Sequence, residues 1–365
     1  MKIHFLFLAL IFVLSSATIS GQNEPQTTQP EQKLSAISKY DFIPGETIMF
    51  FDDFTQDNVG DFPGIWNTNG SGEIVTTNLF PGRWLKLGAE ASFIPGTRKV
   101  FPDNYTVEFD VLPIPGPNGE KTIGLGFYIY TASNPEDFHE GGAIPGMAGI
   151  KMDFGDYQSG YSTYADGEYK MEGYSEKNPL VMNQKTRLSF WIQKTRLRAY
   201  INDVKVFDLA KAFAPGMGYN VLRFVTGSEA QDLIANFRMA VGAPDMRNKL
   251  ITEGKLVTYG IYFDSGSDRI KPESAGTMKE IATVLNENPA VKIKIIGHTD
   301  SDGDDAKNLD LSKRRSVSVR NALSSEYGIE ASRIETDGKG ESQPIAPNTT
   351  SEGKAQNRRV ELIKL

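Results

Sequence analysis

The chain has 365 residues, of which 39% are hydrophobic and 23% are charged, and its formal net charge is -7. This length and composition predict a globular protein of two domains. The negative balance excludes the overall basic footprint of a nucleic-acid-binding protein, and the absence of cysteine excludes disulfides and a cysteine-linked lipid anchor.

Residues 1–20 have the pattern of a secretory signal peptide. Lys2 and His4 precede an apolar run from Phe5 to Leu14 that is too short to span a bilayer, and small residues follow it. The alternative is an uncleaved anchor, but the apolar run is short for one. We therefore expect an exported protein that is not a lipoprotein. No later segment reaches about 18 apolar residues, so we expect no transmembrane helix.

Residues 21–39 are rich in Gln, Thr, Pro, Glu and Ser, which predicts a disordered linker. From residue 40 to 241, short alternating runs are separated by turn signals at roughly ten-residue spacing. The clearest runs are Thr47–Phe54, Glu73–Thr77, Trp84–Leu87, Tyr105–Leu112, Thr122–Tyr130, Gly149–Phe154, Arg187–Ile192, Arg196–Ile201, Val221–Thr226 and Asp232–Met239. This pattern predicts an all-β domain built as a two-sheet sandwich or jelly roll.

These runs resemble the concanavalin-like and laminin-G-like sandwiches at the level of architecture, without a diagnostic motif. The resembling features are Phe51-Asp52-Asp53-Phe54 before Trp66, the run from Thr106 to Asp110, the two runs Leu188–Ile192 and Arg196–Asn202, and the closing Ile234–Arg238.

An outer-membrane barrel is a rival interpretation of residues 40–241. Its strands need one uninterrupted apolar face towards lipid. From Phe190 to Tyr200, one face carries Lys194, Arg196 and Arg198, and the other carries Gln193 and Thr195. A charge at the bilayer midplane costs about 2–4 kcal/mol, so this pattern favours the sandwich.

Residues 242–256 have no clear period and are the expected connector to a second domain, residues 257–365. Its pattern predicts strand, helix, strand, helix, strand, strand, and hence an α+β fold with helices on one side of a mixed sheet. The strands are expected at Leu256–Phe263, Val291–Ile296, Arg333–Thr336 and Val360–Ile363. The helices are expected from Pro272 to about Asn288 and from Asn308 to Tyr327, the second ending at Gly328.

The second of these strands and the second helix enclose a spaced motif. It consists of Gly297-His298-Thr299-Asp300, Gly303, Asn308, Leu311-Ser312, Arg315 and Val319. The motif resembles the OmpA-like peptidoglycan-binding domain. The flanking segments Tyr262–Ser267, Gly338–Glu341 and Asn357–Glu361 resemble it too, so the likeness covers about the last third of the chain. Ser316 departs from the pattern, in which alanine is usual.

The resemblance implies that Asp300 and Arg315 bind the diaminopimelate residue of a cell-wall peptide. Diaminopimelate carries an ammonium and a carboxylate on one carbon. A carboxylate can take the ammonium, and an arginine can take the carboxylate through two parallel hydrogen bonds. Arg315 lies on the inward stripe of its helix, and Asp300 is its expected partner. The resemblance also implies that Asn308, Thr299, Leu311, Ser312, Phe263 and Asp264 surround the site. The alternative for the charged pair is a purely structural salt bridge.

Weaker signals lie outside this motif. Arg358-Arg359 either pins the last strand or adds positive potential near the ligand, and we favour a structural role for at least one of the two. Arg314 is expected to face solvent. Asp302, Asp304 and Asp305 form an acidic loop that lacks the closing glutamate of a calcium loop. The stretch with Tyr157, Tyr161, Tyr164, Tyr169 and Tyr174 is either a sugar-stacking surface or an exposed loop.

Catalysis by the sandwich is the less favoured interpretation. Glu108 and Asp110 share one face of a strand, but Pro113 stands where a laminarinase-like signature needs a third acid. Asp52, Asp53 and Asp232 are candidates for calcium ligands or, more simply, acids at strand edges. We expect no cofactor and no metal.

Together these patterns predict a non-catalytic envelope protein of a Gram-negative bacterium. It would be exported to the periplasm and associated with the outer membrane and the cell wall. Its C-terminal domain would bind peptidoglycan, and its sandwich would hold a glycan or an outer-membrane protein. A wall-tethered enzyme acting on polysaccharide and a membrane barrel with a periplasmic C-terminal domain are the alternatives.

Overall fold

The computed structural model describes residues 40–97, 99–116, 119, 123–139, 144–228, 231–242 and 245–365. The predicted signal peptide and linker lie outside these residues. The chain divides into the units Met1–Ile37 and Ser38–Leu365. The boundaries expected inside the second unit, at 242 and 257, stay predictions.

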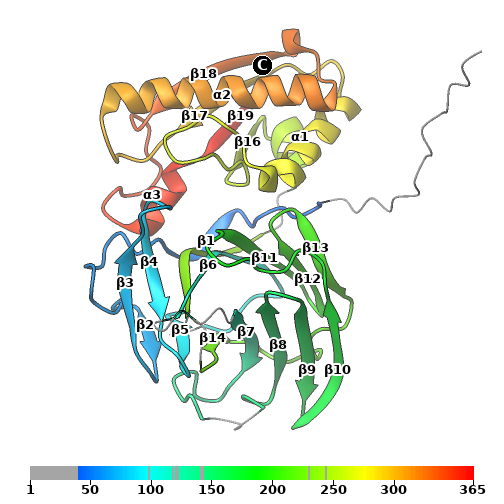
Figure 1. Ribbon diagram of the computed structural model, residues 1–365. Helices are drawn as coiled ribbons and strands as arrows, with labels where there is room; N and C mark the ends of the chain where they lie inside the picture. The colour runs from blue at the N-terminus through cyan, green and yellow to red at the C-terminus, as the bar shows by residue number, and fades with distance from the viewer. Residues whose placement is uncertain are drawn as a thin grey trace, which may run out of the picture. The chain divides into compact units, whose positions relative to one another are not determined.

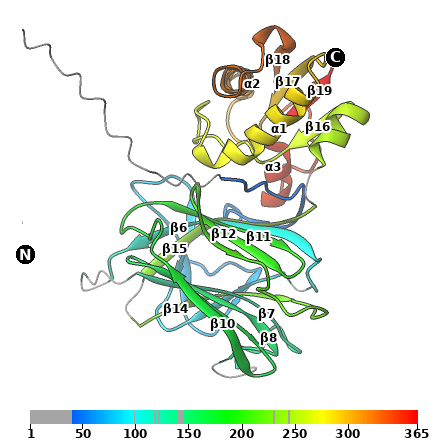
Figure 2. The same ribbon diagram turned by 90° about the vertical axis from the view of Figure 1, so that its right-hand side faces the viewer.

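Two antiparallel sheets form the first half of the described chain, and they pack face to face as two layers (Figures 1 and 2). This confirms the predicted sandwich. In spatial order, one sheet holds β13 (Val204–Leu209), β12 (Arg196–Ile201), β11 (Thr186–Gln193), β6 (Asn104–Ile114), β15 (Gln231–Val241), β4 (Arg83–Leu87) and β3 (Gly72–Thr76), with β1 (Thr47–Asp52) also paired to β15. The other holds β10 (Glu168–Ser175), β9 (Ser159–Ala165), β8 (Ala148–Gly155), β7 (Gly124–Thr131), β14 (Val221–Thr226), β5 (Ser92–Pro95) and β2 (Trp66–Thr68).

Alternation along the strands places the core between the two sheets. In β6, Val107, Phe109 and Val111 point into the core, whereas Glu108 and Asp110 lie on the opposite face. The ring of Phe109 lies 5.0 Å from that of Phe127 and 4.8 Å from that of Phe224 on the facing sheet. These aromatic contacts join the layers and bury large apolar areas.

The tyrosine-rich stretch folds as the hairpin of β9 and β10, so its interpretation as an exposed loop was wrong. Glycines and tyrosines obscured the strand pattern in the sequence. Strand alternation turns Tyr161 towards the main core, whereas Tyr164, Tyr169 and Tyr174 lie on the other face of the sheet. On that face Tyr164 is buried, and Tyr169 and Tyr174 are 54% and 70% exposed. The short strands β2 and β5 were also not expected.

The C-terminal part holds a four-stranded mixed sheet in the order β16 (Lys255–Thr258), β19 (Val360–Lys364), β17 (Ile293–His298) and β18 (Ile334–Gly340). Only the pair of β17 and β18 is parallel. Helices α1 (Ala275–Glu287) and α2 (Asp305–Tyr327) lie on one face of the sheet (Figure 2), which confirms the α+β prediction. Their apolar residues Ile281, Leu285, Val319 and Leu323 share a core with the strands. No helix of the described residues is long and apolar enough to cross a membrane.

Several elements differ from the expectation, and β18 ends at Gly340 rather than at Thr336. The first strand ends at Thr258 rather than Phe263, because the Thr258 hydroxyl accepts a hydrogen bond from the Gly260 amide and the chain turns. Helix α2 begins at Asp305, because the Asp304 side chain caps it by accepting from the Lys307 amide. A short helix, α3 (Ser351–Asn357), interrupts the expected strand–strand ending.

Three further turns are helical but short. They are a π-helical turn at Asn248–Thr252 and 3-10 turns at Pro272–Ser274 and Ala331–Arg333. Pro272 begins the turn that leads into α1, as expected for a proline in a first helical turn.

Candidate functional site

Two glycines allow α2 to lie directly against the ends of the parallel strands. A Cβ atom on Gly297 would lie 2.3 Å from the Ser312 carbonyl oxygen, and one on Gly338 would lie 2.4 Å from the Lys313 amide nitrogen. No larger residue fits at such distances. This close packing carries Asp300, just past the end of β17, to the amino end of α2.

Asp300 is 7% exposed, and its two carboxylate oxygens have different partners. One carboxylate oxygen accepts a hydrogen bond from the Asp302 amide at 3.2 Å, which holds the turn. The other lies 2.5 Å from a guanidinium nitrogen of Arg358. The ion-pair partner of Asp300 is therefore Arg358 and not Arg315, so the expected direct pair was wrong. Arg358 follows α3 and lies 58 residues after Asp300 in the chain. In the sequence, its position in the doublet Arg358-Arg359 was the signal that pointed to it.

Arg315 is held by the loop that follows β16 rather than by Asp300. Its Nε donates to the Ser267 carbonyl oxygen at 2.9 Å, and Nη2 donates to the Asp264 carbonyl oxygen at 3.4 Å. Its guanidinium lies 4.8 Å from the centre of the Phe263 ring. Burial lowers the pKa of Arg315 to about 10, although the nearby Asp300 carboxylate raises it. The side chain stays a cation at neutral pH, next to an anion that it does not touch.

The other predicted site residues divide into supports and walls. Asn308 is 7% exposed, and its amide donates to the carbonyl oxygens of Asp300 and Asp302 and to the Glu341 carboxylate. Ser312 is fully buried and accepts from the Gly340 amide at 2.8 Å. Asn308 therefore holds the turn that carries Asp300, and Ser312 holds α2 against the end of β18.

Thr299, Leu311, Phe263 and Asp264 lie on the elements around the charged pair. The buried Thr299 hydroxyl has no hydrogen-bond partner in the described part of the chain, and Leu311 is partly exposed on α2. Phe263 forms an isolated β-bridge with Ile270, which closes the loop whose carbonyl groups hold Arg315. Asp264 is ion-paired with Arg269, a side chain that is 81% exposed.

Arg359 has the structural role that we expected for one member of the doublet. It is 5% exposed, and two of its nitrogens lie 2.9 Å and 2.8 Å from the Glu361 carboxylate. Burial opposes ionisation of Glu361. His298, Lys255 and Arg359 outweigh that effect and hold the pKa of Glu361 well below its usual range. Arg314 lies at the surface, as expected, between Asp310 and Asp268.

The acids of the loop after Asp300 are engaged by the protein itself. Asp302 pairs with Lys354 at 2.7 Å, and Asp304 caps α2. Among the described residues, no three His, Cys, Asp or Glu side chains are grouped so that they could hold a metal ion.

The acids singled out in the sandwich are likewise occupied, with one exception. Glu108 and Asp110 lie side by side in a buried network, paired with Arg238 at 3.0 Å and Arg187 at 3.1 Å respectively. Asp52 accepts from the Trp66 indole, and Asp53 accepts from the Thr55 amide and hydroxyl. Asp232 is fully buried, and neither of its oxygens has a partner in the described structure.

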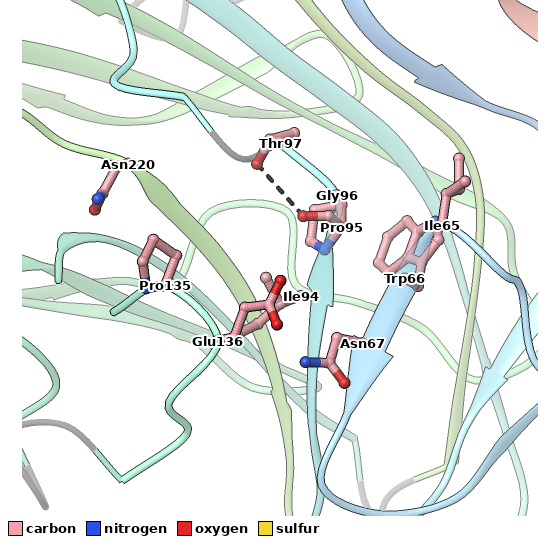
Figure 3. A pocket seen from close by; sticks show the side chains of 10 residues that line it. All are labelled: Ile65, Trp66, Asn67, Ile94, Pro95, Gly96, Thr97, Pro135, Glu136 and Asn220. Atoms are coloured by element: carbon pink, nitrogen blue, oxygen red, sulfur yellow. Dashed lines mark hydrogen bonds between the residues drawn. The ribbon is translucent and has the colours of Figure 1, made fainter. Parts of the chain in front are cut away.

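A small pocket opens beside β2 and β5 in the sandwich (Figure 3). Its lining includes Asn67, Ile94, Pro135, Glu136 and Asn220. Its volume is about 20 Å³, which is room for a single water molecule. The Asn220 amide is already bonded to both backbone groups of Ala132. The pocket therefore offers no room for a sugar.

Comparison with known proteins identifies the C-terminal part. Residues 262–358 match the model of the OmpA family and form an OmpA family domain. The probable lipoprotein YiaD of Escherichia coli (strain K12) is 49% identical over 102 residues, which are 28% of this chain and 46% of the relative. Outer membrane porin F of Pseudomonas aeruginosa is 41% identical over 111 residues, 30% of this chain and 32% of the relative. The chain thus spans less than half the length of either relative.

Two solved structures are similar to different parts of the chain. The peptidoglycan-associated lipoprotein from Burkholderia pseudomallei is 31% identical, and the match covers 29% of this chain and 88% of that one, with a TM-score of 0.27. The carbohydrate-binding module CBM66 from Bacillus subtilis is 14% identical, and the match covers 48% of this chain and 95% of that one, with a TM-score of 0.34.

Proposed function

We propose that the C-terminal domain binds the diaminopimelate residue of peptidoglycan non-covalently, and that the protein is a non-catalytic component of the cell envelope. The observation that supports this proposal is that the Asp300 carboxylate lies close enough to Arg315 to raise its pKa, whereas the ion-pair partner of Asp300 is Arg358. A zwitterion needs an anion and a cation a few ångströms apart, and each must keep some capacity for a ligand. The match to the OmpA family supports this assignment.

The surroundings explain why the pair is held in place. The Asn308 side chain fixes the turn that carries Asp300, and backbone carbonyl groups with the Phe263 ring fix Arg315. Such fixed side chains lose little conformational entropy when a ligand binds. The ammonium of the ligand would replace Arg358 at Asp300, and its carboxylate would lie against Arg315.

The test is co-sedimentation of the full chain with isolated sacculi. Asp300→Ala and Arg315→Ala should each weaken binding at least about tenfold, because each removes one partner of a charged hydrogen-bond pair. Arg314→Ala is the matched control, since it removes a neighbouring cation that lies at the surface. Equal binding by the parent and both site variants would contradict the proposal.

A specific surface favours a second activity, glycan binding by the sandwich. Tyr169 and Tyr174 are exposed on β10, on the face of the sheet that is turned away from the core. Lys151 of β8 donates to the Tyr169 hydroxyl at 3.2 Å, and its ammonium lies 5.6 Å from the centre of that ring. Exposed rings beside hydrogen-bonding side chains suit the apolar faces and hydroxyl groups of a sugar.

Retention on polysaccharide gels tests this second activity. Tyr174→Ala and Tyr169→Ala should reduce the retention of the full chain. Leu79→Ala should not, although Leu79 is 65% exposed as well. Undiminished retention of both tyrosine variants would exclude this face as the glycan site. Release of reducing sugar from the same gels would instead favour the enzymatic alternative.

The proposed location follows from the same features. Peptidoglycan lies outside the cytoplasmic membrane, and residues 1–20 have the pattern of a signal peptide. We therefore place the protein in the periplasm of a Gram-negative cell, associated with the wall and the outer membrane. Fractionation of cells that produce the full chain tests this location directly.

A further inference from the structure

Arg358 lies between two acids that come from distant parts of the chain. Its Nη1 atom lies 2.5 Å from an Asp300 carboxylate oxygen, and its Nη2 atom lies 3.7 Å from Oδ2 of Asp53. Asp53 directly follows β1 of the sandwich and belongs to the same compact unit as Arg358, Ser38–Leu365. The guanidinium also lies 5.6 Å from the centre of the Phe51 ring of β1. The sandwich therefore offers a second carboxylate and an aromatic ring to the cation that occupies Asp300.

The contact between Arg358 and Asp53 can still shorten. A charged hydrogen bond between arginine and a carboxylate is about 2.7–2.9 Å long, so the distance of 3.7 Å is about 1 Å longer than such a bond. Arg358 has room to move, because its side chain is 35% exposed. Its neighbour Arg359 is 5% exposed and is bonded to the Glu361 carboxylate and to two carbonyl oxygens. Arg358 is thus the member of the doublet that can change partners.

The Asp53 carboxylate is held in one orientation beside Arg358. Its Oδ1 atom accepts from the Thr55 amide at 3.2 Å and from the Thr55 hydroxyl at 2.7 Å, which leaves Oδ2 for the guanidinium. Because the Thr55 hydroxyl donates its proton to Asp53, it accepts from the Ser351 hydroxyl, which lies 3.2 Å away at the start of α3. These hydrogen bonds join the carboxylate to the helix that leads into Arg358.

We propose that Asp53 receives Arg358 when the ammonium of a ligand takes its place at Asp300. Asp53 would then be a positioning residue that the sandwich contributes to the diaminopimelate site. This inference rests on the proposed function, because the ligand that displaces Arg358 is diaminopimelate. A guanidinium that left Asp300 without a new partner would be an unpaired charge in a partly buried place, which is costly. With Asp53 beside it, each charge keeps a partner in the free and in the bound state.

Calorimetry of the full chain with free meso-diaminopimelate tests this exchange. Asp53→Asn keeps an oxygen that can accept from Thr55 but removes the charge that receives Arg358. It should weaken binding about tenfold, the effect of losing one charged hydrogen bond. Asp61→Asn is the matched control, because it removes the same charge from an exposed position of the loop between β1 and β2. It should bind like the parent.

Arg358→Gln separates the exchange from a purely structural role of Asp53. It removes the cation that competes for Asp300, so it should bind diaminopimelate at least as tightly as the parent. In the Arg358→Gln background, Asp53→Asn should cause no further loss, because no guanidinium is left to be received. If Asp53→Asn fails to fold, Phe51→Leu replaces it. That variant removes the ring beside the guanidinium and should weaken binding about two- to fivefold, again only when Arg358 is present.

The outcomes distinguish this inference from the proposed function. Parent-like binding by Asp53→Asn overturns the inference alone. So does a loss that persists in the Arg358→Gln background, since Asp53 would then act without Arg358. Weaker binding by Arg358→Gln than by the parent also overturns it, because Arg358 would then contact the ligand and not move to Asp53. Failure of the parent to bind diaminopimelate overturns the proposed function and this inference with it.

Discussion

At the scale of single residues, the Asp232 carboxyl group is buried and has no partner among the described residues, and burial raises its pKa from 3.8 to about 7. The folded state thus holds the proton more tightly than the unfolded chain. The contribution of Asp232 to stability is greatest below about pH 4 and falls as the pH rises towards 7. Asp232→Asn should therefore raise the free energy of unfolding at pH 8 by about 1–3 kcal/mol and change it little at pH 4.

Urea denaturation at the two pH values measures this effect. Asp203→Asn is the control, because Asp203 is exposed in a turn of the same domain. An Asp232→Asn variant that differs from the parent by the same amount at both pH values would show that the carboxyl group is solvated or paired in solution.

Asp110 presents the opposite case. Burial alone would raise its pKa, but Arg187 and Lys185 outweigh burial and lower it to about 2. Its contribution to stability is present above about pH 4 and is lost as the pH falls towards 2. Arg187→Met leaves Glu108 and Asp110 buried without this cation. We expect a loss of about 3–5 kcal/mol at pH 7 and acid unfolding that begins at a higher pH.

Thermal melts between pH 3 and pH 7 test this expectation. Arg196→Met is the matched control, because its pair with Asp208 is partly exposed and should contribute less than about 1 kcal/mol. If both substitutions cost the same, the buried network has no special role in stability.

At the scale of elements, the start of α2 depends on one side chain. The Asp304 carboxylate accepts from the Lys307 amide at 3.0 Å and satisfies one of the free amides of the first turn. Asp304→Ala should lower the free energy of unfolding by about 1 kcal/mol. Asp310→Ala, at an exposed position inside the same helix, should cost less than about 0.5 kcal/mol. Chemical denaturation measures the free energy of unfolding of both variants. Equal losses in the two variants would contradict the capping role of Asp304.

Elements with strong local signals were predictable from the sequence, and elements fixed by tertiary contacts were not. The alternation of β6, Pro272 before α1 and Gly328 after α2 are local features, and the structure shows each as expected. Helix α3 has only seven residues, and its cap at Thr350 gave a weak signal. The hairpin of β9 and β10 lacked a clear apolar alternation.

The same distinction applies to the candidate site. The motif around β17 and α2 located Asp300, Asn308 and Arg315, because all three lie within one strand–turn–helix unit. It did not show that Arg358 pairs with Asp300, since that contact joins segments 58 residues apart. Nor did it show that backbone carbonyl groups hold Arg315, because carbonyl groups leave no trace in a sequence.

At the scale of the whole molecule, the two proposed binding surfaces belong to different parts of the chain, one at α2 and one at β10. If both operate, the protein is a bridge: it should retain sacculi on polysaccharide-coated beads, and neither surface alone should suffice. Asp300→Ala should abolish the retention of sacculi while the protein still binds the beads. Tyr169→Ala with Tyr174→Ala should abolish binding to the beads while the protein still sediments with sacculi.

The double pull-down also separates bridging from simple stickiness. The chain carries a net charge of -7, so attraction to an anionic wall by net charge is not expected. Raising the salt from about 0.1 M to 1 M shortens the screening length from about 10 Å to about 3 Å. Because Asp300 is buried and Arg315 is partly buried, salt screens these charges less than exposed ones, and retention should fall only modestly with salt. A steep loss that is the same in the parent and in Asp300→Ala would mean that non-specific charge, and not the zwitterion site, holds the sacculi.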